Sequence, residues 1–292
     1  MVPPHEVMKG GIFVCERQAM TQYVYLDTNA FRYFGIAFRN VPLAEELRNR
    51  ILISPLSAFE IFGQLADEND GSNVLSQIQA VRNWTNRRHC GLLPWPTEML
   101  HQLWFQRPIQ DNEFTKQMEV SLNICLTADS VESVRAEAVK HKQVMDRFKE
   151  QAAQAFKGML DAARAERRKT VNMTDAWFHG IATRARADPN SRPVPEIVAT
   201  LNAYYEFEKS RLERALADAG YNPLSPRNLN DAIDSEQLVY LGDPMLRMLT
   251  SDRGFKGKLA QSTQRSRIVI VPPGDLMDAQ RAAHVLRCSS AA

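Results

Sequence analysis

Cysteine is scarce in this 292-residue sequence, and the four that occur are scattered. None belongs to a Cys-x-x-Cys pair, which argues against a zinc site or a disulfide framework and fits a reducing cytoplasm. No apolar run reaches the length of a membrane span. The first twenty residues carry charges and no apolar core segment, so they do not resemble a signal peptide. These absences favour a cytoplasmic protein without a membrane segment.

Several common kinds of active site are also missing. The six histidines are far apart and lack the spacing of paired metal ligands. No serine lies in a nucleophile elbow, and no glycine-rich phosphate loop is present. The formal net charge is only +2, which gives no strong drive toward nucleic acid and does not exclude it, because local patches matter more than totals.

The stretch from Tyr23 to Phe34 is the clearest feature that is present. The apolar run Tyr23–Leu26 predicts a strand buried on both faces. Asp27, Thr28 and Asn29 follow, and they suit a turn and the start of a helix. An acidic side chain after a buried strand lies where open α/β sheets bind ligands. The alternative is that Asp27 only caps the helix.

Three more short apolar runs predict strands, at 51–53, 245–249 and 268–271. The run at 51–53 is followed by Ser54 and Pro55, a strong helix start. Pro42 is expected to open a helix before this run. Strands alternating with helices predict an α/β fold in which helices flank a central parallel sheet.

The middle of the chain has a different composition, because glycine is nearly absent and Ala, Glu, Lys, Arg and Gln dominate. One or two long helices are expected over residues 131–168 and another over 201–219. This region is predicted to be an all-helical insertion or a helical subdomain. The predicted division is a discontinuous α/β domain (21–110 and 221–280), the helical part (111–220) and two flexible arms (1–20 and 281–292).

A basic cluster in this helical part, Arg164, Arg167 and Arg168, is a candidate contact for a nucleic-acid backbone. The basic Arg184 and Arg186, together with the aromatic Tyr204 and Tyr205, are further candidates. The alternative is a solvated helix face, since acidic residues are interleaved with the cluster.

Five carboxylates have related positions in the predicted elements. Asp27 and Asp252 each follow a strand, Glu60 lies in the helix after the second strand, and Asp231 and Asp234 begin another helix. Strand ends and helix starts meet at one edge of a parallel sheet, so these groups are expected to converge. Packed carboxylates raise one another's pKa, and a divalent cation removes that penalty. Ligands that are all oxygen favour Mg²⁺ or Mn²⁺ over zinc.

Four motifs together resemble those of the PIN-domain ribonucleases. Leu-Asp-Thr-Asn at 26–29 looks like the opening motif, and Ile53-Ser54 followed by Glu60-Ile61 is similar to the second. Asp234 precedes Asp252 by eighteen residues, as the third and fourth acidic positions of the family do. Leu-Thr-Ser-Asp-Arg-Gly-Phe at 249–255 resembles the terminal T-x-D-x-x-F signature. The chain is about twice as long as a minimal PIN domain.

The resemblance implies a Rossmann-like PIN fold and a metal-dependent endonuclease that hydrolyses RNA. Asp27, Asp234 and Asp252 would bind the metal and Glu60 would complete the catalytic set. Asp231 is an alternative or additional third ligand, and Glu236 is a weaker one. Thr28, Asn29 and Thr250 would hold the carboxylates in position.

Partners follow from the resemblance as well. Small PIN proteins are often toxins held by an antitoxin, and dimers are common in the family. The resemblance therefore admits an antitoxin or another protein partner and a homodimer, besides RNA. The alternative function is a catalytically inactive PIN-like scaffold that binds RNA or protein.

Overall fold

The computed structural model describes residues 22–67, 71–85, 91–107, 113–165 and 173–291. Its centre is a four-stranded sheet in the order β2-β1-β3-β4, in which each neighbouring pair is parallel. The predicted α/β fold with a parallel sheet is therefore confirmed. The strands are β1 (Tyr23–Leu26), β2 (Ile51–Ile53), β3 (Leu246–Thr250) and β4 (Ile268–Ile270).

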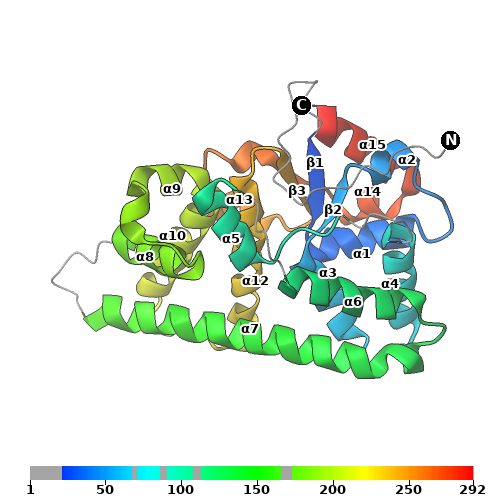
Figure 1. Ribbon diagram of the computed structural model, residues 1–292, viewed down its shortest axis with the longest axis horizontal. Coiled ribbons are helices and arrows are strands. Elements are labelled where there is room, and N and C mark those ends of the chain that lie inside the picture. The colour runs from blue at the N-terminus through cyan, green and yellow to red at the C-terminus, as the bar shows by residue number, and fades with distance from the viewer. Residues whose placement is uncertain (1–21, 68–70, 86–90, 108–112, 166–172, 292) are drawn as a thin grey trace.

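Strand β1 is central and covered on both faces, as its continuous apolar sequence predicts. Val24 and Leu26 face one apolar cluster, and Tyr25 faces the other. The buried Tyr25 hydroxyl donates a hydrogen bond to the backbone oxygen of Gln237 at 2.7 Å. The sheet thus separates two layers of helices (Figure 1).

The first layer packs on the face of Val24 and Leu26. Its helices α1 and α4 are in close contact, because a Cβ added to Gly35 would lie 1.8 Å from the Cβ of Ala80. Only glycine at position 35 allows this approach. The elements of this layer are α1 (Thr28–Ala37), α2 (Glu45–Arg48), α3 (Pro55–Gln64), α4 (Gly71–Thr85), α14 (Pro273–Met277) and α15 (Ala279–Ala291).

The second layer packs on the face of Tyr25, around aromatic side chains such as Trp104, Phe178 and Phe207. It combines helices from the middle of the chain with helices near the last two strands. The elements on this side are α5 (Pro96–Phe105), α8 (Met173–Arg184), η1 (Pro189–Ser191), α9 (Val194–Thr200), α10 (Asn202–Ala217), α11 (Pro226–Leu229), α12 (Asp231–Gln237), η2 (Leu238–Gly242), α13 (Gly254–Lys258) and η3 (Arg265–Arg267).

Two further helices are α6 (Glu113–Thr127), which packs in the first cluster, and α7 (Val131–Ala165), which extends from that cluster to α10 of the second layer. Helix α7 runs along one side of the whole molecule (Figure 1), and its 35 residues span about 52 Å. Its start packs in the first cluster, its middle against α3, and its end against α10. The helical insertion therefore shares its cores with the α/β part.

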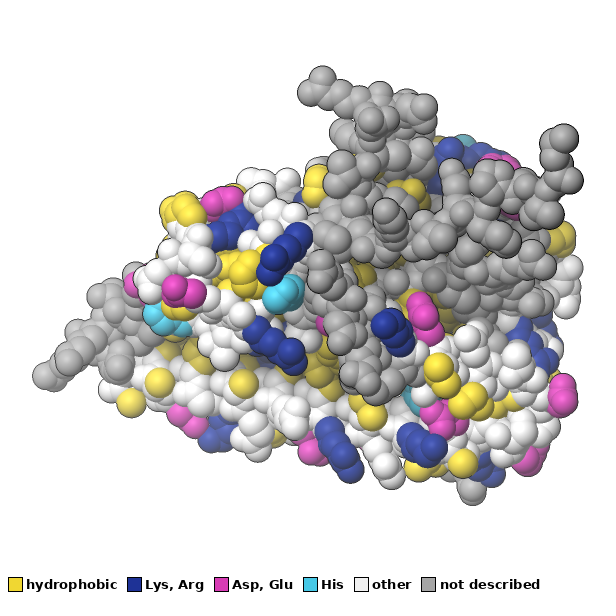
Figure 2. Space-filling model, viewed as in Figure 1, with side chains coloured by type: hydrophobic (Ala, Val, Ile, Leu, Met, Phe, Trp, Pro, Cys, Tyr) yellow, Lys and Arg dark blue, Asp and Glu magenta, His cyan; other side chains and the backbone are white. Residues whose placement is uncertain are grey.

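Charged residues recur along α7, and acidic and basic side chains are interspersed on the face drawn in Figure 2. Within the described residues, no helix is both long and apolar enough to cross a membrane.

Residues 131–165 form a single helix, which is one of the two expected possibilities. Two local expectations differ from the structure. Pro42 does not open a helix, because α2 begins only at Glu45. The expected arm at 281–292 is helical up to Ala291, because Ala282 and Leu286 are buried against the first layer. The expected arm at 1–20 lies outside the described residues.

Candidate active site

Two of the predicted carboxylates lie at the carboxyl edge of the sheet. Strand β1 ends at Leu26 and is followed by Asp27, while β3 ends at Thr250, two residues before Asp252. The strands are parallel neighbours, and the Asp27 N–H donates to the oxygen of Leu249 at 3.0 Å. The two acidic groups are therefore brought to one edge although they are far apart in the sequence.

Asp27 is the N-cap of α1 and is 7% exposed. One carboxylate oxygen accepts the N–H of Ala30 at 2.7 Å, and the other accepts the hydroxyl of Thr250. The pKa of Asp27 is raised to about 6, mainly by burial; these two hydrogen bonds lower it, and the charges of Asp252 and Glu60 raise it. Asp27 therefore caps helix α1 and also belongs to the acidic group at this edge of the sheet.

Glu60 joins three helices at this edge. One of its oxygens accepts the hydroxyl of Thr28, on the first turn of α1. The other lies 2.7 Å from the ammonium nitrogen of Lys149, which comes from the middle of α7 and also donates to Asn230 at 3.0 Å. Placing the Glu60 carboxylate among apolar side chains costs free energy unless it has a partner, and Lys149 is that partner.

Asp234 approaches the same group from α12. Its pKa is raised to about 7, mainly by burial; the charge of Lys258 lowers it, and the charges of Asp252, Asp231 and Glu60 raise it. The Lys258 ammonium lies 3.6 Å from the Asp234 carboxylate. Asp252 and Glu60 thus act electrostatically on both Asp27 and Asp234.

Asp231, one turn earlier on α12, is surrounded by donors. It lies 3.0 Å from Lys258 and accepts the hydroxyl of Tyr221 at 3.2 Å. Arg211 and Arg214 are each 3.9 Å away. Of the two alternatives for the third acidic position, Asp231 has the more complete set of ion-pair partners, and Asp234 has the raised pKa.

The three residues predicted to support the carboxylates differ in position. Thr250 is fully buried and bonds to Asp27, and Thr28 bonds to Glu60. Asn29 is exposed on the first turn of α1.

The arrangement has a clear limit as a metal site. No three His, Cys, Asp or Glu residues of the described chain lie close enough together to hold one ion. Asp252 and Glu60 raise the pKa values of Asp27 and Asp234, and each carboxylate is tied to local donors. Their donor atoms are all oxygen, which suits Mg²⁺ or Mn²⁺. The donor chemistry therefore fits such an ion, and direct ligation would require the side chains to move together.

The predicted basic contacts are placed differently. Arg164 donates to the backbone oxygens of Ala215 and Asp218, at 2.9 and 3.0 Å, and so binds the end of α10. Arg167 and Arg168 lie outside the described residues.

Arg184, Tyr204 and Glu236 form a separate internal network. Arg184 pairs with Glu236 and donates to the Tyr204 hydroxyl at 2.7 Å. Tyr204 and Glu236 are buried, so these groups support the second layer.

Two lysines of the site were not among the predicted residues. Lys149 occupies a place in the buried stripe of α7, one turn after Met145 and one turn before Ala153. A lysine within an apolar stripe is the sequence signal that could have identified it, because buried lysines need a partner. Lys258 lies in the short helix α13 and has no comparable signal.

Comparisons with protein-family models, with curated proteins and with solved structures found no match to this chain.

Proposed function

We propose that this chain is a metal-dependent endonuclease that hydrolyses RNA phosphodiester bonds. The observation that carries the proposal is the electrostatic coupling of four carboxylates from four elements. Asp252 and Glu60 each raise the pKa of both Asp27 and Asp234, at the carboxyl edge of a parallel sheet. Perturbed acidic groups at such an edge are typical of functional sites.

Asp27, Asp234 and Asp252 would hold Mg²⁺ or Mn²⁺, directly or through water. An ion bound there supplies a water of lowered pKa and positive charge near the phosphate. Glu60 would accept a hydrogen bond from the attacking water and so orient it.

The neighbouring side chains keep these carboxylates in place. The Thr250 hydroxyl fixes one oxygen of Asp27, and the Thr28 hydroxyl fixes one oxygen of Glu60. Lys149 uses two of its three donors on Glu60 and Asn230. Within the described residues its third donor has no partner, and it would give a phosphate oxygen a positive contact beside the acidic group.

The test is cleavage of a labelled single-stranded RNA with Mg²⁺, with Mn²⁺ and with EDTA. Wild-type protein is compared with Asp252→Asn and with a control, Asp161→Asn, whose exposed carboxylate pairs with Lys157 on α7. We expect metal-dependent cleavage that is lost in Asp252→Asn and kept in the control. Cleavage that persists in EDTA or in Asp252→Asn would contradict the proposal.

A second candidate is a PIN-like scaffold that binds RNA or protein without cutting. The spacing of the carboxylates favours it, since no described set can share one ion without movement. Calorimetric titration with Mn²⁺ separates the two, because the scaffold would neither bind the ion nor cleave RNA.

A further inference from the structure

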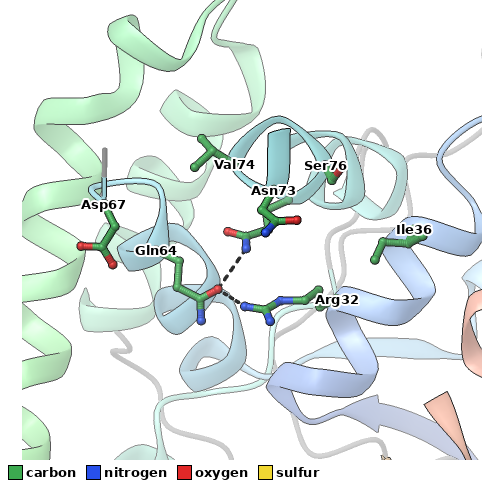
Figure 3. A pocket seen from close by; sticks show the side chains of 8 residues that line it. Arg32, Ile36, Gln64, Asp67, Asn73, Val74 and Ser76 are labelled. Carbon is green, nitrogen blue, oxygen red and sulfur yellow. Dashed lines mark hydrogen bonds between the residues drawn. The ribbon is translucent and has the colours of Figure 1, made fainter. Parts of the chain in front are cut away.

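A cavity of about 240 Å³ opens between helices α1, α3 and α4 (Figure 3). We call it the Arg32 pocket. Arg32 from α1 and Gln64 from α3 point toward one another across it, and Ile36 and Val74 are apolar lining residues on opposite sides. Ser76 and Gln77 of α4 also line it. Its volume is below the roughly 300–1,000 Å³ of most ligand pockets, so it suits a single small ring system.

The polar groups of the Arg32 pocket are incompletely paired. The side-chain oxygen of Gln64 accepts hydrogen bonds from Arg32 and from the Gln77 amide, the latter at 3.0 Å. The Nε of Arg32 and the Oε1 of Gln77 are buried and have no hydrogen-bond partner in the described chain. Gln77 is only 6% exposed. Buried donors and acceptors of this kind are normally satisfied, so two residues that line the pocket each carry a polar atom without a partner in the described chain.

The pocket adjoins the candidate active site. Thr28 and Arg32 are one turn apart on α1, and Glu60 and Gln64 are one turn apart on α3. Each pair is bonded across the two helices, Thr28 to Glu60 and Arg32 to Gln64. Residues one turn apart on a helix are about 5–6 Å from each other. A strand with its phosphate beside Glu60 therefore reaches the pocket with a neighbouring nucleotide.

We propose that the Arg32 pocket binds one nucleobase of a single-stranded RNA whose backbone lies on the carboxylates. This inference rests on the proposed function for the identity of the polymer. A base has a flat apolar face and an edge of donors and acceptors. Guanidinium groups stack on or bond to such rings, and glutamine amides read base edges through paired hydrogen bonds. The apolar lining residues Ile36 and Val74 and the unpaired groups of Arg32 and Gln77 match these two properties.

The test measures binding without cleavage. The four nucleoside 5′-monophosphates and ribose 5-phosphate are titrated separately into full-length Asp252→Asn protein in EDTA, by calorimetry and by NMR. We expect at least one nucleotide to bind at least roughly tenfold more tightly than ribose 5-phosphate, since one good base contact is worth that much.

Two variants locate the binding. The substitutions Arg32→Met and Gln77→Leu are made in the Asp252→Asn background. Each is expected to lower the affinity for the nucleotide by about tenfold. Arg39→Met, which removes an exposed arginine after α1, should leave the affinity unchanged. Circular dichroism verifies that each variant is folded, and Arg32→Lys serves as a milder change if Arg32→Met does not fold.

The outcomes separate this inference from the proposed function. Equal affinity for nucleotides and ribose 5-phosphate, or base binding unaffected in folded Arg32 and Gln77 variants, would overturn the pocket assignment. Either result leaves metal-dependent cleavage by wild-type protein untouched. Conversely, base binding at the pocket in a wild-type protein that cuts no RNA would overturn the nuclease and retain the pocket as a base-binding site.

Discussion

At the scale of single residues, Thr250 contacts two of the acidic residues of the site. Its hydroxyl donates to Asp27 and accepts the N–H of Asp252 at 2.9 Å. It therefore fixes one carboxylate and the backbone that carries another. A threonine before a turn is ordinary in sequence, and its importance depends on a partner 223 positions away.

Thr250→Val tests this role. Removing the donor takes away a hydrogen bond that lowers the pKa of Asp27, so the acid side of the pH–rate profile should move to higher pH. The cleavage rate at neutral pH should fall roughly 10–100-fold, as for other groups that support metal ligands. Thr183→Val, at an exposed threonine bonded to its own helix, is the control. An unshifted profile in Thr250→Val would contradict the role.

Asp27 and Asp234 also make a prediction about stability. Their pKa values, about 6 and about 7, lie above the ordinary 3.8. The folded state therefore binds protons at these two carboxyl groups more tightly than the unfolded chain does. The stabilisation of the folded state that results is lost as the pH rises from about 4 to about 7. Each unit of elevation is worth at most about 1.4 kcal/mol.

The measurement is the thermal midpoint in EDTA from about pH 5 to about pH 8. Wild-type protein should lose stability relative to the double variant Asp27→Asn/Asp234→Asn across this window. Mg²⁺ or Mn²⁺ should restore part of the loss in wild type only, because a ligand of the folded state stabilises it. Parallel curves for the two proteins would show that these groups are not perturbed.

At the scale of elements, α7 delivers a cation to a site made by other helices. Lys149 and Glu60 are both about one-sixth exposed, and their pairing joins α7 to α3. The sequence predicted both helices, because each has an apolar stripe or a strong start. It could not predict that they meet, since the register between distant helices is set by packing and not by local pattern.

Lys149→Met should therefore weaken both the fold and the activity. It leaves Glu60 half-buried without its cation, which should cost about 1–3 kcal/mol in urea unfolding. Lys142→Met, on the same helix, breaks the more exposed pair with Asp67 and should cost less than about 1 kcal/mol. A double-mutant cycle with Glu60→Gln should give a coupling energy above zero. Additive effects would mean that the two side chains do not interact.

The contact of α1 with α4 gives a second prediction at this scale. Gly35→Ala should destabilise the protein by roughly 1–3 kcal/mol, because the new Cβ would meet the Cβ of Ala80 at 1.8 Å. Ala80→Gly in the same chain should recover part of this, and the remaining loss should reflect the nearby Ala80 Cα. Gly158→Ala on α7, with no atom within 4 Å of its added Cβ, should instead stabilise by about 0.5–1 kcal/mol. Equal effects at positions 35 and 158 would contradict the contact.

At the scale of the whole molecule, the sequence predicted the individual strands and helices better than the way in which they pack together. Strands β1, β2, β3 and β4 were recognisable because each is a short apolar run. The helical middle was expected to be an insertion or a subdomain, whereas Leu122 and Val134 pack in the same cluster as Val24. Composition distinguishes segments that differ in glycine content, and it does not show which apolar faces they share.

A shared core predicts one cooperative unfolding transition. Far-UV circular dichroism, which reports all helices, and tryptophan fluorescence, which includes the buried Trp104 and Trp177 of the second layer, should give the same midpoint in urea. Two separated transitions would show that the helical middle unfolds as an independent unit.

The pairing of β1 with β3 has a consequence for synthesis of the chain. Asp27 leaves the ribosome early, but its neighbouring strand and its partner Thr250 are made more than two hundred residues later. Until then the central strand lacks one side of its sheet, and the acidic groups remain apart. Under the proposed function, a nascent chain would therefore gain a complete acidic site only when almost the whole protein has been translated.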